Sequence, residues 1–158
     1  MSRYSCTSVS VAHIVQEAGI TAEIVGAHEV VISGITQDSR SVQPGDLFCC
    51  VLGLLSDGHA FVEQAIGSGA VALLVDTAQP NVPAHVTQIV VSSVRDVLGS
   101  VAGATFGHPS RALKMTGITG TNGKTSTAYI LGEILKANGA TVLVVGTLTG
   151  ERTTPEAI

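Results

Sequence analysis

The sequence predicts an α/β protein with a mostly parallel sheet. Apolar runs typical of buried strands alternate along the chain with segments that carry apolar residues at helical spacing, and this alternation is typical of parallel strands joined by helices. Hydrophobic residues make up 45% of the 158 residues, but aromatic residues only 3%. The core must therefore be built from Val, Ile, Leu and Ala, a composition typical of folded α/β proteins and not of disordered chains.

Eight elements are expected in the first part of the chain. Ser8 or Ser10 can cap a first helix, and Gly19 can end it. The turn Pro44–Asp46 precedes a near-continuous apolar run, which suits a strand covered on both faces. In chain order we expect a helix over 11–18, strands over 23–25, 29–35 and 47–52, a helix over 59–69, strands over 71–75 and 88–91, and a helix over 94–106.

The pattern breaks at His108, because Pro109 disfavours helical backbone in the residue before it. We therefore place a domain boundary there, with a first domain over 1–107 and the start of a second over 108–158. The second contains an expected strand over 113–119, a glycine-rich loop over 120–124, a helix over 125–137 and a strand over 141–145. Two strands bury too little surface to be stable alone. Either this unit packs on the first domain or, as we expect, the chain is the N-terminal part of a longer protein.

Charge and cysteine content exclude several classes of protein. The net charge is −4 and no basic run occurs, so we expect no nucleic-acid partner. No apolar stretch approaches the roughly 18 residues of a membrane-spanning helix, so we expect no membrane partner. The three cysteines, Cys6, Cys49 and Cys50, form no C-x-x-C pair. The sequence therefore indicates neither a disulfide framework nor a zinc site. We expect a reduced, cytoplasmic protein.

The glycine-rich loop has the context of a phosphate-binding loop, because it joins an expected strand to an expected helix. Glycines let backbone N–H groups point at phosphate oxygens, and the helix N-terminus adds positive potential. Lys124 can neutralise the terminal phosphates, and the Thr125 hydroxyl can ligate Mg²⁺. The loop departs from the strict phosphate-binding pattern, which has a glycine six residues before the lysine, because Ile118 stands at that position. Gly117 and Gly120 serve instead. A plain tight turn is the alternative interpretation.

The segment Thr119–Thr125 resembles the ATP loop of the Mur ligases and of their folate-polyglutamate relatives. Further segments resemble the uridine-binding N-terminal domain of the E and F types of this family: Asp38–Arg40, Pro44–Phe48, Asp57–His59 with Phe61, and Gly69–Ala70. Others look like the E type: His108–Ser110, Thr121–Asn122, Gly146–Thr147 and Thr153–Pro155. The resemblance covers essentially the whole chain and favours the E type.

The resemblance implies an ATP-dependent ligase of peptidoglycan synthesis. In this family the substrate carboxylate of UDP-N-acetylmuramoyl-L-alanyl-D-glutamate takes the γ-phosphate of ATP, and the amine of a diamino acid, diaminopimelate or lysine, then forms the amide bond. ATP and Mg²⁺ are the implied cofactors, and the full-length enzyme is expected to be a monomer. The family also uses further Mg²⁺ ligands, a carbamoylated lysine and a C-terminal domain outside these residues. We therefore do not expect the 158 residues alone to be catalytically competent.

The resemblance also implies roles for individual residues. The set implied to bind ATP comprises Gly120, Thr121, Asn122, Gly123, Lys124, Thr125 and Ser126, with Lys124 as the catalytic residue and Thr125 as the Mg²⁺ ligand. The set implied to bind the UDP substrate comprises Gln37, Ser39, Leu54, Leu55, Ser56, Arg152, Thr153 and Thr154.

Simpler interpretations stand beside several of these assignments. Ser39 can instead cap a turn, and Thr153–Thr154 can be an ordinary exposed loop. Asp38 and Arg40 can form a salt bridge that steadies their own loop.

Other classes of function also stand beside the E-type ligase. The chain can be a non-catalytic module that binds a UDP-sugar peptide, or a ligase of the F or folate-polyglutamate type. The histidines support no hydrolase site, and we expect His59 and His108 to be structural.

Overall fold

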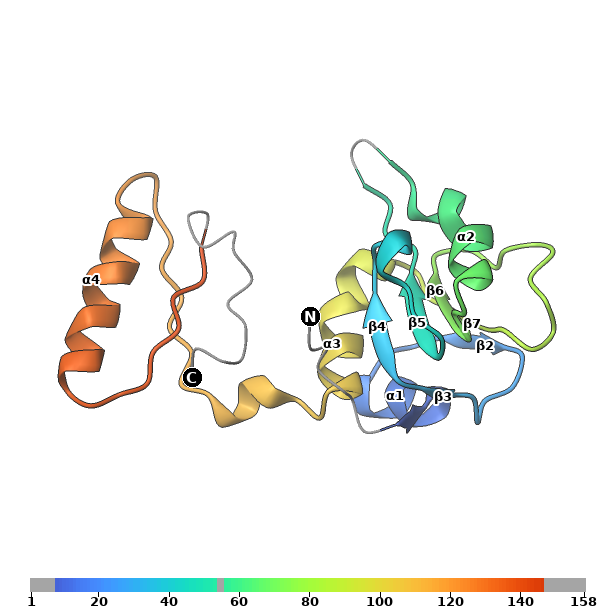
Figure 1. Cartoon of the computed structure of the whole chain (residues 1–158), viewed down its shortest axis with the longest axis horizontal. Coiled ribbons are helices and arrows are strands. Elements are labelled where there is room, and N and C mark those ends of the chain that lie inside the picture. Colours follow the sequence, from blue (N-terminus) through green and yellow to red (C-terminus); the bar gives the residue numbers. More distant parts are fainter. Residues whose placement is uncertain (1–7, 54–55, 147–158) are drawn as a thin grey trace. The chain divides into compact units, whose positions relative to one another are not determined.

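The structure of the chain, a computed structural model, describes residues 8–53 and 56–146 (Figure 1). It divides into two compact units, Met1–Leu113 and Lys114–Ile158. The boundary expected from the sequence lies earlier, between residues 107 and 108. A short 3-10 helix, η3 (Pro109–Ala112), separates the two positions and belongs to the first unit.

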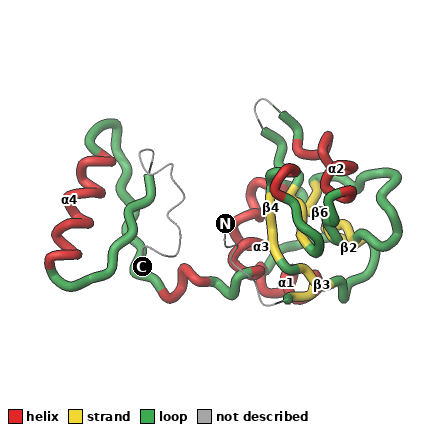
Figure 2. Tube along the Cα trace, in the orientation of Figure 1, coloured by secondary structure: helices red, strands yellow, loops and turns green. Residues whose placement is uncertain are grey.

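The first unit is built around a five-stranded sheet with the strand order β2-β7-β6-β5-β4 (Figures 1 and 2). Its strands are β2 (Glu23–Val25), β4 (Gly34–Thr36), β5 (Asp46–Cys49), β6 (Ala72–Val75) and β7 (Thr87–Val90). The four strands β4 to β7 pair in parallel, and β2 pairs antiparallel with β7 at one edge. The prediction of a mostly parallel sheet is confirmed.

The described part of this unit contains three α-helices, namely α1 (Val11–Ala18), α2 (Val62–Gly67) and α3 (Val94–Thr105). The Ser10 side chain accepts a hydrogen bond from the His13 N–H, and Gly19 ends α1 with a φ of +63°. Both ends of α1 therefore match the sequence prediction.

Three predicted elements of the first unit differ from the structure. The strand expected over 47–52 is shorter, because β5 ends at Cys49. The single strand expected over 29–35 is split into β3 (Val31–Ile32), which pairs with β1 (Val9–Ser10), and β4, which pairs with β5. The split occurs because the chain leaves the small antiparallel pair at Ser33 to enter the large sheet. The helix expected over 59–69 begins as a 3-10 helix, η2 (Gly58–Phe61), before α2.

The core lies on both faces of the sheet. On one face, buried residues of α1 and α3 pack against Leu47, Cys49, Leu74 and Ile89. On the other face, α2 packs against the alternating residues of the same strands: Phe48, Cys50, Leu73 and Val75. Burial raises the pKa of the Cys49 thiol above its usual range, and burial followed by the nearby carboxylates raises that of Cys50 to about 12. Both cysteines therefore act as small apolar core residues.

The second unit contains one helix, α4 (Lys124–Ala137), among its described residues. The strands predicted over 113–119 and 141–145 are not formed in the described structure. A strand requires ladder hydrogen bonds to a neighbour, and no described segment of this unit supplies them. The 141–145 segment instead packs on α4: a Cβ added at Gly132 would lie 3.0 Å from Val144 Cγ2. No helix in the described ranges is long and apolar enough to cross a membrane.

Replacing Leu73 with Ala is expected to lower the free energy of unfolding of the first unit by about 2–5 kcal/mol, because this side chain of β6 is fully buried between the sheet and α2. The matched control is Leu113→Ala, since this leucine is 63% exposed, and it should change stability by less than about 0.5 kcal/mol. Urea unfolding followed by circular dichroism measures both. Equal effects of the two variants would contradict the described core.

Candidate functional site

Several polar side chains of the first unit follow the carboxyl ends of its parallel strands. Ser39 follows β4, the segment 50–58 follows β5, and Asp76 follows β6. Ligands of open α/β sheets bind at this edge, because the loops that leave parallel strands meet there. The edge is therefore the candidate binding site of the first unit.

Ser39 begins a 3-10 helix, η1 (Ser39–Ser41), and is only 8% exposed. Its hydroxyl donates a hydrogen bond of 3.0 Å to Oε1 of Gln64, which lies on α2. The neighbouring Gln37 is exposed. The sequence analysis selected Ser39 and Gln37 but missed Gln64. The contact spans 25 positions along the chain, so only the packing of η1 against α2 reveals it.

Asp38 and Arg40 form the local ion pair that the simpler interpretation describes. One carboxylate oxygen of Asp38 accepts from the Arg40 backbone N–H at 3.0 Å and from its Nε at 2.9 Å, and the other accepts from Nη2 at 2.9 Å. These hydrogen bonds, the side-chain bond first, lower the pKa of Asp38 from 3.8 to about 2. The Arg40 charge is therefore committed within its own loop.

His59 connects the end of the 50–58 segment to the residue that follows β6. Its Nδ1 lies 2.6 Å from Asp57 Oδ1, and its Nε2 accepts a hydrogen bond of 3.3 Å from the Asp76 N–H. Nδ1 therefore carries the proton when the ring is neutral. Hydrogen bonds from His59, the backbone bond first, lower the pKa of Asp57. The structural role expected for His59 is confirmed by these contacts.

The same segment contains three of the predicted substrate residues. Ser56 is exposed, and its carbonyl accepts a hydrogen bond of 2.9 Å from the Gly53 N–H. Leu54 and Leu55 lie outside the described residues. The Arg95 guanidinium on α3 donates a 2.6 Å bond to the Leu52 carbonyl, and the sequence analysis did not anticipate this contact.

His108 anchors the chain at the end of the first unit. Its backbone N–H donates a hydrogen bond of 2.7 Å to the Gly103 carbonyl, and its ring Nε2 lies 3.3 Å from Glu17 Oε1. Arg111 Nη1 lies 3.7 Å from the same carboxylate oxygen. These contacts confirm a structural role for His108.

In the second unit, the glycine-rich loop leads directly into α4. Gly123 precedes the helix with a φ of +73°, a conformation that favours glycine. The helix begins at Lys124, whose Nζ donates to the Gly120 carbonyl. The first N–H groups of α4 and the Lys124 ammonium thus gather at the loop, an arrangement suited to an anion.

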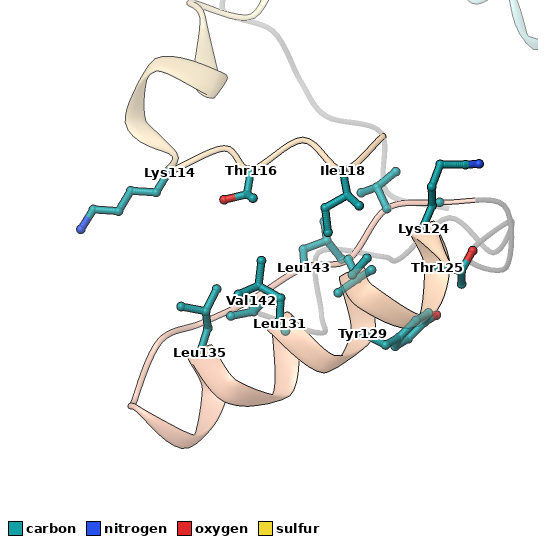
Figure 3. A pocket seen from close by; sticks show the side chains of 15 residues that line it. Lys114, Thr116, Ile118, Lys124, Thr125, Tyr129, Leu131, Leu135, Val142 and Leu143 are labelled. Atoms are coloured by element: carbon teal, nitrogen blue, oxygen red, sulfur yellow. The ribbon is translucent and has the colours of Figure 1, made fainter. Parts of the chain in front are cut away.

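A cavity of about 280 Å³ adjoins this loop (Figure 3). Lys124, Thr125 and Tyr129 from the first turns of α4 lie at one end of it, and Leu135 and Val142 at the other. Most of the lining residues are apolar, but Lys114 and Thr116 also line the cavity, so its polar groups are not confined to the start of α4. Arg152, Thr153 and Thr154 lie outside the described residues.

Comparisons with known proteins identify both units. The family described as "Mur ligase family, catalytic domain" matches residues 31–105, and the "Mur ligase middle domain" matches residues 118–158. The chain therefore belongs to the Mur ligase family, and the predicted resemblance is confirmed.

Curated relatives carry the E-type name. The UDP-N-acetylmuramoyl-L-alanyl-D-glutamate--2,6-diaminopimelate ligase of Alkaliphilus metalliredigens is 38% identical over 147 residues, which cover 87% of this chain and 30% of the relative. The chain spans about 30% of the length of the curated relatives it matches.

Solved structures of F-type ligases share the fold. MurF from Acinetobacter baumannii superposes with a TM-score of 0.67 and 28% identity, over 91% of this chain and 31% of that one. MurF from Thermotoga maritima, solved in complex with ADP, superposes with a TM-score of 0.51 and 32% identity, over 65% of this chain and 23% of that one.

Replacing Arg40 with Gln is expected to return the pKa of Asp38 from about 2 toward 3.8, because the variant removes the guanidinium donors. The folded-state pKa is depressed, so the ion pair stabilises the fold above pH 3.8 and is lost as the pH falls through about 2. Carboxyl ¹³C chemical shifts measured against pH report the value. Arg95→Gln is the control, since Arg95 bonds to Leu52; an unmoved Asp38 titration in Arg40→Gln would refute the assignment.

Proposed function

We propose that the chain carries the UDP-substrate domain, residues 1–107, and the start of the ATP-binding domain, residues 108–158, of an ATP-dependent ligase. The ligase joins a diamino acid to UDP-N-acetylmuramoyl-L-alanyl-D-glutamate in the cytoplasm, as a step of peptidoglycan synthesis, and acts as a monomer. The observation that carries the proposal is the anion-binding arrangement at the start of α4, within a chain whose relatives are named as such ligases.

The loop residues have the chemistry that ATP requires. The segment from Gly120 to Ser126, which also contains Thr121 and Asn122, would supply backbone N–H groups to the phosphates. Lys124, which lies over the loop against the Gly120 carbonyl, would turn to the terminal phosphates and neutralise charge that develops on them. The Thr125 hydroxyl is a hard oxygen donor of the kind that Mg²⁺ accepts. The related Thermotoga maritima ligase, whose structure was solved with ADP, supports this use of the fold.

The strand edge of the first unit would hold the UDP part of the substrate. Ser39, Gln37 and Ser56 follow the carboxyl ends of β4 and β5, where this class of sheet binds ligands. Leu54–Leu55 and the segment Arg152–Thr154 enter this proposal through the family resemblance.

Replacing Lys124 with Ala is expected to weaken Mg·ATP binding about ten- to a hundredfold, because a charge-assisted contact to the phosphates is lost. In a full-length ligase that carries this loop, turnover should fall by orders of magnitude. Isothermal titration calorimetry measures the affinity of the chain. Lys136→Ala is the control on the same helix, since Lys136 pairs with Glu133 at 2.9 Å. Equal ATP affinity in the Lys124 variant and the wild type would contradict the proposal.

Addition of UDP is expected to shift the amide resonances of the η1 residues around Ser39 and of Ser56, because these residues lie at the proposed uridine site. A two-dimensional ¹H–¹⁵N titration measures these shifts. Shifts confined to residues 120–125 would show instead that UDP binds only at the phosphate loop.

A further inference from the structure

Ser39 and Gln64 form a polar pair between two elements that are distant in the sequence. The Ser39 hydroxyl donates to Gln64 Oε1 at 3.0 Å. The elements behind them are fixed by apolar packing, because Val42 directly after η1 lies in the same buried cluster as Val62 and Ala65 of α2. The pair is therefore held in register by the core.

This bond sets the polarity that Ser39 shows to a ligand. A serine hydroxyl has one proton and two lone pairs. Since the proton is directed at Gln64, the oxygen is left as an acceptor. The bond likewise occupies Oε1 of Gln64, whose Nε2 donors have no partner among the described residues. The pair thus presents an acceptor beside a donor.

The charges around the pair favour an uncharged ligand group. The only cation on η1 and α2 is Arg40, and Asp38 holds its guanidinium through two hydrogen bonds. The residue before Gln64 is the acidic Glu63. A diphosphate would meet no uncommitted positive charge on these two elements, whereas a neutral base would meet no penalty.

We propose that Gln64 is a specificity residue of the nucleotide site: together with Ser39 it reads the edge of a uracil base, where an N–H lies beside a carbonyl. The uracil N3–H would donate to Ser39 Oγ, and the adjacent carbonyl would accept from Gln64 Nε2. Cytosine has a lone pair at N3 and an amino group at C4, so with the ribose held in one place it opposes the pair at both positions. This inference rests on the proposed function, because it assumes that the strand edge binds the uridine part of the substrate.

The experiment compares the affinities of the 158-residue chain for UDP and CDP by calorimetry. Gln64→Glu keeps the acceptor for the Ser39 hydroxyl but removes the donors. Its added charge affects the two diphosphates equally, so the ratio of the two affinities isolates the contact to the base. We expect the wild type to prefer UDP, and Gln64→Glu to reduce that preference by about five- to tenfold, the equivalent of one lost hydrogen bond. The matched control is Gln16→Glu, which makes the same change at an exposed position on α1, across the sheet from α2.

The outcomes distinguish the role of Gln64 in base specificity from the presence of a uridine site at the strand edge. A reduced preference in Gln64→Glu with an unchanged preference in Gln16→Glu supports the inference. An unchanged preference in a folded Gln64→Glu variant overturns it and leaves the proposed uridine site standing. Binding of neither nucleotide by the wild type overturns the uridine site and the inference together. If circular dichroism shows that Gln64→Glu does not fold, Ser39→Ala removes a single oxygen and must reduce the preference in the same direction, or the inference is wrong.

Discussion

The arrangement of the first unit depends on the burial of β5 and β6 on both faces. All four residues of each strand are buried, and each strand pairs in parallel on both sides. A parallel strand covered on two faces must be reached by crossovers that pack helices above and below the sheet. This constraint places α1 and α3 on one face and α2 on the other. It also brings η1, the 50–58 segment and Asp76 to one edge.

The charged residues at that edge satisfy one another at short range. Asp38 holds Arg40, and Asp57 holds His59. Asp76 accepts from the Val94 N–H at the start of α3 while its own N–H donates to His59. Ion pairs and caps of this kind fix loops in shape while leaving little net potential. The edge is therefore suited to recognition by directed hydrogen bonds, in contrast to the phosphate loop, where an ammonium and helix N–H groups gather.

The sequence predicted those features that depend on neighbours along the chain. The alternation of apolar runs indicated the parallel sheet, and Ser10 and Gly19 marked both ends of α1 because capping is a local interaction. Gly123 and Lys124 were recognised for the same reason. Gln64 and Arg95 escaped notice, because their contacts to Ser39 and Leu52 join positions far apart. The prediction of two strands in the second unit is wrong for the same reason, because an apolar run forms a strand only when another segment supplies the backbone hydrogen bonds of the ladder.

Gly132 allows the 141–145 segment of the second unit to pack closely on α4. The absence of a side chain there lets Val142 and Val144 rest against the helix, with Val144 Cγ2 only 3.0 Å from where a Cβ would stand. Close-packed surfaces of this kind transmit displacement and do not absorb it. A larger residue at this position would require the Val144 side chain to shift by a few tenths of an ångström. Since the same helix carries Lys124 and Thr125 in its first turn, the close contact at Gly132 joins the segment 141–145 to the element that bears both residues.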